Sequence, residues 1–300
     1  MEFGLGGRPV SVSGSITLLA ALRDELGVRS AKDGCAPQGQ CGCCTVWVDG
    51  EPRVSCVTPA ARVSGRRVTT LDGLDAGVRD RWADALCASG GSQCGFCTPG
   101  IVMRLAAERH QSTVRSDIAS SLTAHLCRCT GWQTILDAAV MVASGEHDDF
   151  PRDDESANQR ASIEGRSAQV VSPRVALGEG GFAEDTAPED AWVAVLAPDG
   201  TWSVASNITE ARQRAGVVQG RRSTLGINWP IEPPTGEFVR TLSTTWVEPA
   251  YLEPDAVWCR PGGEPFGPTE NGGAFGDKAR WLRDEARRLA DENQRPMRVV

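Results

Sequence analysis

The stretch Gly34-Cys35-Ala36-Pro37-Gln38-Gly39-Gln40-Cys41-Gly42-Cys43-Cys44-Thr45-Val46-Trp47-Val48-Asp49-Gly50 decides how the first part of the chain folds. With Cys56 added, its cysteines Cys35, Cys41 and Cys44 follow the spacing C-x5-C-x2-C-x11-C. Plant-type [2Fe–2S] ferredoxins hold their cluster with C-x4-C-x2-C and a distant fourth cysteine. The glycines between these cysteines give the backbone the freedom to wrap a cluster. The stretch therefore predicts a [2Fe–2S] site whose first gap is one residue longer than usual.

Two alternatives stay open for this stretch. Cys43 lies inside the C-x2-C step and is interpreted as a spectator, although Cys41 and Cys43 could exchange roles. A four-cysteine zinc site is the other alternative. Zinc sites usually carry two short C-x2-C-like pairs, and this stretch has one.

A second set of cysteines lies further along the chain. Cys94, Cys97, Cys127 and Cys129 have the spacing C-x2-C-x29-C-x-C. The C-x-C step is unusual for zinc, and two cysteines so close cannot comfortably form a disulfide. Each pair adjoins a predicted helix, so that two loop ends can meet around one four-thiolate cluster. The spacing predicts a second iron–sulfur site.

Cysteine usage and charge limit the class of protein. Ten of the 11 cysteines lie between Cys35 and Cys129, and the odd total argues against a secreted disulfide scaffold. No signal peptide or long apolar run is visible, so we expect a cytoplasmic chain with no membrane contact. The formal charge of −8 gives no reason to expect a nucleic-acid partner.

Hydrophobic patterning predicts an α+β chain with three structural parts and one linker. Residues 1–74 read as a small mixed domain with a hairpin over 3–12, a helix from Thr17 to Gly27, a hairpin around Asp49-Gly50 and a strand at 68–71. Residues 75–144 read as a helical domain with helices at 77–88, 99–110, 115–126 and 132–143. Residues 145–166 read as an acidic, solvated linker. Residues 167–300 read as β-rich, with strands at 192–196 and 202–204 and one helix at 277–292.

Residues 1–145 resemble the iron–sulfur subunit of the molybdenum hydroxylases, which include xanthine dehydrogenases, aldehyde oxidoreductases and aerobic carbon monoxide dehydrogenases. The resemblance is carried by GCAPQGQCGCCTVWVDG, VTTLDGL, QCGFCTPGIVM and CRCTGW. It implies a ferredoxin-like β-grasp domain and a four-helix domain, each holding one [2Fe–2S] cluster. It also implies that the second cluster lies beside a molybdopterin, which Gln93 and Cys129 touch. Cys87 matches no ligand position and is expected to be an ordinary buried cysteine.

The C-terminal part resembles the opening portion of the large molybdenum-binding subunit of the same family. The matching features are the Tyr251-Leu252-Glu253 stretch, the loop GGAFGDK, a following helix and the segment 295–300. The resemblance places the backbone of Gly273, Ala274, Phe275 and Gly276 against the molybdenum cofactor. Asp277 replaces a glycine of the family loop. Cys259 is expected to pack in this part and not to bind metal.

The resemblance implies a subunit of a molybdopterin-dependent hydroxylase that is not active alone. Electrons would pass from a molybdopterin shared with a partner chain, through two [2Fe–2S] clusters, to FAD on another subunit. The family's general-base glutamate has no candidate here, so no catalytic residue is assigned to this chain and the base is expected on the partner. The alternative function is a stand-alone electron carrier whose C-terminal half is a docking domain.

Overall fold

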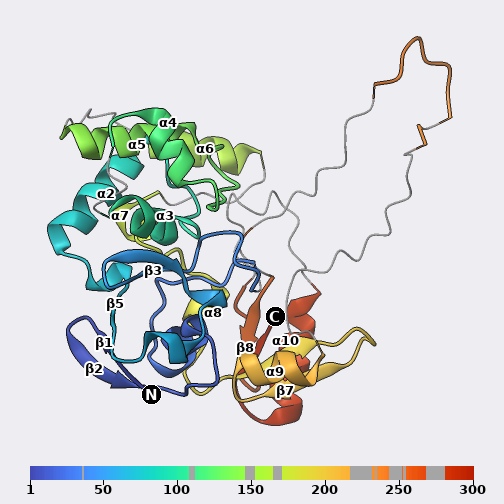
Figure 1. Cartoon of the computed structure of the whole chain (residues 1–300). Coiled ribbons are helices and arrows are strands. Elements are labelled where there is room, and N and C mark those ends of the chain that lie inside the picture. The colour runs from blue at the N-terminus through green and yellow to red at the C-terminus, as the bar shows by residue number, and fades with distance from the viewer. Residues whose placement is uncertain are drawn as a thin grey trace.

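The computed structural model describes residues 1–35, 37–107, 112–145, 153–164, 171–216, 232–233, 235–242, 252, 255–267 and 281–300. Two sheets and a group of helices make up this part of the chain (Figure 1). Helices and strands are thus combined without regular alternation, and the predicted α+β class is confirmed.

The first sheet is formed by the N-terminal residues in the order β2-β1-β5-β3-β4. Its strands are β1 (Glu2–Leu5), β2 (Arg8–Ser11), β3 (Thr45–Val48), β4 (Glu51–Val54) and β5 (Arg67–Thr69). The β1–β5 pair is parallel and the other pairs are antiparallel. Asp49 and Gly50 join β3 to β4 with φ values of 53° and 84°, the turn that an Asp-Gly pair favours. Both predicted hairpins are therefore present at the predicted positions.

The helix predicted after Thr17 is shorter and less regular than expected. The α-helical part is α1 (Leu18–Ala20), which continues as a π-helical turn at Ala21–Glu25. Three short 3-10 turns follow in this part of the chain, at Ser55–Val57, Ala60–Val63 and Leu71–Gly73. Leu18 and Leu22, four residues apart, are both buried, and Leu26 is half-buried.

Four helices occupy the described residues between 75 and 145. They are α2 (Ala76–Ser89), α3 (Thr98–Leu105), α4 (Arg115–Ser121) and α5 (Gln133–Ser144). The prediction of a helix over 115–126 is wrong for its second half, because α4 ends at Ser121. Thr123 Oγ1 donates to the Ser120 carbonyl at 2.7 Å, and the amide of Leu126 bonds outside the helix, to the carbonyl of Cys41.

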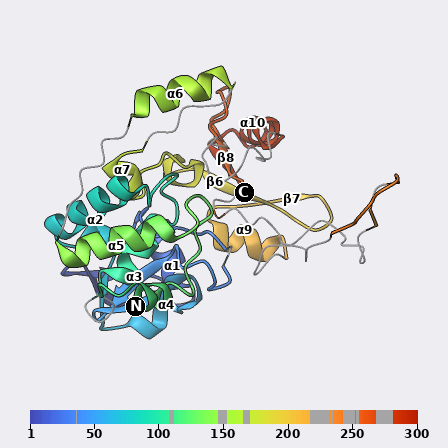
Figure 2. The same ribbon diagram turned by 90° about the horizontal axis from the view of Figure 1, so that it is seen from above.

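The acidic stretch that the sequence predicts to be a solvated linker contains a helix, α6 (Asp154–Ile163). Asp153 caps it by accepting a hydrogen bond from the Ser156 amide at 2.9 Å. Its described side chains are exposed or half-buried, and Figure 2 shows it apart from α2 and α5. This helix was not predicted because its sequence lacks the apolar residues at helical spacing that indicate an amphipathic helix.

The C-terminal part is built on a second sheet in the order β7-β6-β9-β8. Its strands are β6 (Trp192–Leu196), β7 (Trp202–Ala205), β8 (Val257–Cys259) and β9 (Met297–Val299). Helix α10 (Leu282–Asn293) packs on one face over Ala194, Val257 and Met297. Helix α9 (Ile208–Arg214) covers the other face over Val193 and Ala205.

One apolar core runs through the first sheet and the four helices. It joins Leu22, Val46 and Val68 of the first sheet region to Ile101 and Ile135 of the helices. Because this core is continuous, the two sets of cysteines are held in one packed body. Two short helices, α7 (Pro173–Ala176) and α8 (Ala183–Thr186), lie against that body before the chain enters the second sheet (Figure 1).

Candidate metal centres

The first set of cysteines lies on the loop before β3 and on the turn after β4. Cys35, Cys41, Cys44 and Cys56 are all buried. The Cys35 thiol contacts those of Cys41 and Cys56, and the Cys56 thiol also contacts that of Cys44. The structure therefore brings the four predicted ligands together.

Backbone amides are directed at these sulfurs. The Gln38 amide donates to Cys35 Sγ at 3.2 Å, and the Cys56 amide donates to Cys44 Sγ at 3.4 Å. Amides that donate to thiolate sulfur favour the charged form of the ligand and adjust the potential of an iron–sulfur cluster.

Thiol–thiol contact shifts the acidities of this set in opposite directions. Contacts with Cys41 and Cys56 lower the pKa of Cys35, whereas the contact with Cys35 raises the pKa of Cys41 and of Cys56. Four thiols at such short range cannot all ionise unless a cation compensates their charge. The donor set thus fits a cationic metal centre.

Cys43 is also buried, and its thiol contacts that of Cys41. Its Sγ donates to the carbonyl of Cys41 at 3.7 Å, and its own carbonyl accepts from the Lys32 amide at 3.1 Å. Cys43 therefore lies within reach of the first set, and the alternative in which Cys41 and Cys43 exchange roles stays open.

The second set of cysteines joins two loops that are distant in sequence. Cys94 and Cys97 precede α3, and Cys127 and Cys129 precede α5. The sulfurs of Cys94 and Cys129 lie 3.4 Å apart, and the Cys97 thiol contacts that of Cys127. The structure therefore brings this predicted set together as two pairs. Cys97 is buried and the other three are half-buried.

Pairing also shifts the acidities of the second set. Contact with Cys129 raises the pKa of Cys94, and contact with Cys127 raises that of Cys97. The contact with Cys97 lowers the pKa of Cys127 to about 6. One member of the pair is therefore poised to be a thiolate near neutral pH.

The turn after Cys129 has an unusual backbone. Gly131 and Trp132 both have positive φ, 63° and 76°. A bulky residue in this region is strained and is found mainly where the surrounding structure imposes it. Trp132 occupies the N-cap position of α5, and its carbonyl accepts from the Ile135 and Leu136 amides, so this turn fixes where the helix starts relative to the C-x-C pair.

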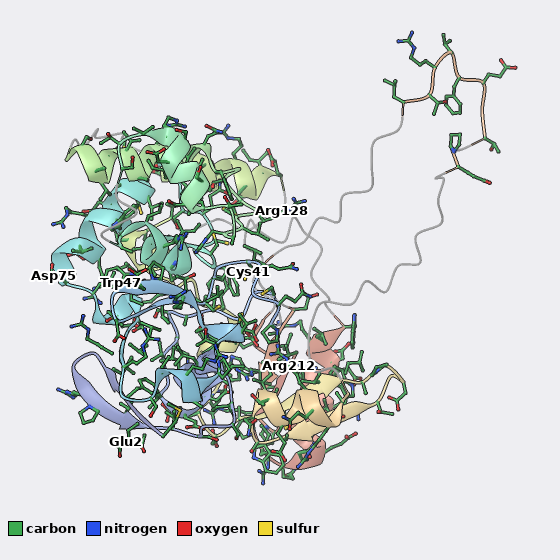
Figure 3. All side chains as sticks on the ribbon, viewed as in Figure 1. Glu2, Cys41, Trp47, Asp75, Arg128 and Arg212 are labelled. Atoms are coloured by element: carbon green, nitrogen blue, oxygen red, sulfur yellow. The ribbon has the colours of Figure 1, made fainter. Side chains whose placement is uncertain are left out.

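The two sets of cysteines are in direct contact through their loops. The Leu126 amide donates to the carbonyl of Cys41 at 3.0 Å, and Leu126 immediately precedes Cys127. Figure 3 shows Cys41 at this junction, with Arg128 of the other loop on the side of the helices. Helix α3 also touches the first loop, because a Cβ on Gly100 would lie 2.1 Å from the carbonyl oxygen of Gly42.

His125 and Thr45 complete the junction, and neither was predicted from a sequence pattern. His125 is buried, and its Nε2 lies 3.0 Å from Thr45 Oγ1, which donates to the Gly42 carbonyl at 2.7 Å. A Cβ on Gly42 would come within 2.4 Å of the imidazole ring. In the sequence, only the position of His125 two residues before Cys127 indicates that it lies near this site.

The remaining predicted site residues are less informative. Gln93 is half-buried beside Cys94. The loop residues Gly273, Ala274, Phe275 and Gly276 lie outside the described residues. Cys87 was expected to be buried and is instead half-buried at the end of α2. Cys259 is buried in β8, where its thiol donates to the carbonyls of Arg260 and Gly263.

Two sets of four cysteines on an α+β frame are typical of the class of iron–sulfur proteins. Residues 70–140 match the family described as [2Fe-2S] binding domain. The chain is 40% identical over 129 residues to the xanthine dehydrogenase iron-sulfur-binding subunit of Escherichia coli O157:H7, covering 41% of this chain and 80% of that protein. The chain therefore belongs to the family of iron–sulfur-binding subunits of xanthine dehydrogenase-type oxidoreductases, and the predicted resemblance is confirmed.

Solved structures extend the similarity. An aldehyde oxidoreductase from Desulfovibrio desulfuricans is 29% identical, with a TM-score of 0.54, over 65% of this chain and 23% of its own. The aldehyde oxidoreductase from Desulfovibrio gigas aligns with all of this chain at a TM-score of 0.64, 17% identity and 49% of its own length. The second likeness shows that the fold is shared. This chain spans less than half the length of either oxidoreductase.

The described residues contain no helix that is long and apolar enough to cross a membrane.

Proposed function

We propose that this chain is the electron-transfer subunit of a molybdenum hydroxylase and carries two [2Fe–2S] clusters. Cys35, Cys41, Cys44 and Cys56 would hold the first cluster, and Cys94, Cys97, Cys127 and Cys129 the second. A bound [2Fe–2S] cluster supplies one-electron chemistry, whereas a hydroxylation releases two electrons. Two such centres in series would let this chain pass the pair on one electron at a time.

The observation that carries the proposal is the hydrogen bond between the two loops. From Cys41 Sγ the path runs through its own backbone to the carbonyl oxygen, across 3.0 Å to the Leu126 amide, and one residue on to Cys127. The loops also meet backbone to backbone beside this bond, because a Cβ on Gly42 would lie 2.7 Å from the Ala124 carbonyl oxygen. This path gives the two proposed clusters a short connection through backbone atoms and one hydrogen bond.

The grouping of the thiols supports iron–sulfur clusters over zinc. A structural zinc ion needs four ligands around one point. The second set instead contacts as two pairs, Cys94 with Cys129 and Cys97 with Cys127. Two thiolates on each of two irons would reproduce this grouping.

Metal and sulfide analysis tests the proposal. The purified protein should contain about four irons and four sulfides per chain, by the count of two two-iron clusters. It should show two distinguishable EPR signals after reduction. A colourless protein that contains zinc would refute the proposal.

Three further parts of the proposal concern partners. The resemblance of the C-terminal part supports a molybdopterin held jointly with a second chain, which would also supply the glutamate base. A flavoprotein carrying FAD would accept the electrons, and the assembled complex would work in the cytoplasm. A related iron–sulfur protein is a subunit by its name, which supports a multi-subunit assembly.

Co-purification separates this proposal from a stand-alone electron carrier. A tagged chain should bring down a pterin-containing chain and a flavoprotein at fixed stoichiometry. An isolated chain that is stable, lacks pterin and exchanges electrons with added acceptors would favour the alternative.

A further inference from the structure

The segment Ser172–Thr186, here named the clamp, lies directly on the second set of cysteines. The carbonyl oxygen of Val175 occupies the place of a side chain at Gly95, where a Cβ would lie only 2.0 Å from it. A Cβ on Gly180 would likewise come within 2.8 Å of the Cys94 carbonyl oxygen. Clamp and cysteine loop therefore touch backbone to backbone. Helix α7 of the clamp also packs beside α2 (Figures 1 and 2).

Phe182 is the apolar anchor of the clamp. It is 1% exposed and belongs to the core of the first sheet and the four helices, although it comes from beyond residue 171. Its ring meets that of Phe96 edge to face, with the ring centroids 5.1 Å apart. Phe96 lies between Cys94 and Cys97, so Phe182 packs against the middle of the loop that carries this pair.

A buried group of charges locks the clamp in position. Asp185 accepts from Arg23 at 2.9 Å and also from Lys32. Lys32 is 1% exposed, donates to the Gly178 carbonyl at 2.7 Å and lies 5.2 Å from the Phe182 ring centroid. Since the Lys32 amide also bonds to Cys43, the same residue connects the clamp to the first cysteine loop.

We propose that the clamp forms a wall of the second cluster's site and sets the reduction potential of that cluster by limiting the access of water to Cys94 and Cys97. This inference rests on the proposed function, because it requires a cluster at these cysteines. Reduction adds negative charge to a centre that already carries four thiolates, and water stabilises such charge better than an apolar wall. Phe182 and Gly95 are positioning residues. The Phe182 ring supplies apolar surface to the wall, and Gly95, which has no side chain, allows the backbone of the clamp to contact the cysteine loop.

The test is a redox titration of the intact holoprotein, followed by the two EPR signals. Phe182→Ala should admit water and move the second cluster to a higher potential. We expect about a tenfold change in its reduced-to-oxidised ratio at fixed potential, about 59 mV for one electron. The first cluster should keep its potential. Phe182→Leu, which keeps most of the wall, should shift the second cluster much less.

Two glycines with positive φ provide a matched pair. Gly95 and Gly145 have φ of 77° and 72°, but a Cβ on Gly145, which follows α5, would meet nothing within 4 Å. Gly95→Ala should push the clamp away, shift the second potential upward and speed the loss of that cluster to a chelator. Gly145→Ala carries only the backbone strain and should leave the potential of the second cluster unchanged.

Each outcome separates the two proposals. If the wild-type protein lacks the second signal, the proposed function fails and this inference fails with it. If both signals are present and neither Phe182→Ala nor Gly95→Ala moves the second potential, only this inference is overturned. If Phe182→Ala loses the first signal too, its fold is damaged, and the Gly95→Ala and Gly145→Ala pair becomes decisive: equal potentials in these two variants refute the role of the clamp.

Discussion

The two cysteine sites are built by opposite routes. The first takes three of its four proposed ligands from a stretch of ten residues, and all four are buried by the sheet that the same stretch enters. The second takes its ligands from two loops about thirty residues apart, and three of the four stay half-buried. A local loop defines the first site, whereas the second exists only after α2, α3, α5 and the clamp have packed. Damage to the first site should therefore stay local, and damage to packing should affect the second site first.

Ligand replacement should have the largest effect and stay confined to one site. Cys44→Ser should abolish the EPR signal of the first cluster, because no other cysteine keeps the C-x2-C step from Cys41. The matched variant is Cys43→Ser, next to it in sequence and equally buried, which should leave both clusters in place. Iron content per chain gives a second readout. Loss of the first signal in Cys43→Ser with retention in Cys44→Ser would show that the ligands are assigned wrongly.

Gly42→Ala should disturb both cysteine sites at once, because Gly42 lies where their two loops meet. Its φ is 71°, and a Cβ would lie 2.4 Å from His125 and 2.7 Å from the Ala124 carbonyl oxygen. Strain and overpacking together should cost about 3–5 kcal/mol of unfolding free energy. The Leu126–Cys41 connection should loosen with it, so that exchange of the Leu126 amide with solvent becomes faster.

The control for Gly42→Ala is Gly50→Ala. Gly50 also has positive φ, 84°, but a Cβ there would meet nothing within 4 Å. This change should cost only about 1–2 kcal/mol. If denaturant titrations gave the same loss of unfolding free energy for both variants, the contact with His125 would not contribute to the effect of Gly42→Ala.

Thr45→Val tests the junction more gently. The substitution keeps the shape of the side chain but removes the hydroxyl that donates to the Gly42 carbonyl and meets His125. Thr45 is buried, so a loss of about 1–3 kcal/mol is expected. Urea titration measures this loss. An unchanged midpoint would show that water replaces the hydroxyl at no cost.

The smallest expected effect is on the stability of the β3–β4 hairpin and follows from replacing Asp49. The Arg67 amide and the Arg66 guanidinium hold the pKa of Asp49 below its ordinary value of 3.8. The stabilisation is fully present above that ordinary value and is lost as pH falls through the lower, folded value. Asp49→Asn, which still suits a positive φ, should therefore lower the melting temperature slightly near neutral pH. It should also flatten the decline in melting temperature below pH 4, by the same linkage. A decline as steep as that of the wild type would contradict this assignment.

Prediction from sequence succeeded where the signal was local. The Asp49-Gly50 turn and the cysteine spacings depend on residues close together in the chain, and the structure brings each cysteine set together. The end of α4 was predicted wrongly, because the amide of Leu126 bonds to Cys41, some 85 residues earlier. The contacts of His125 with Thr45 and of Lys32 with Asp185 also join residues that are far apart in the sequence. These contacts are made by tertiary packing and leave no period or spacing in the sequence.

The clamp and the loop on which it closes belong to a single chain, 75 residues apart from Cys97 to Ser172. Their encounter is thus intramolecular, and two groups joined in one chain meet at an effective concentration set by the chain between them. Closure is consequently independent of how dilute the protein is. If the same segment were supplied by a separate polypeptide, the second site would be complete only where the two chains were abundant. The covalent connection makes the site's completeness a property of each molecule, even when few copies are present.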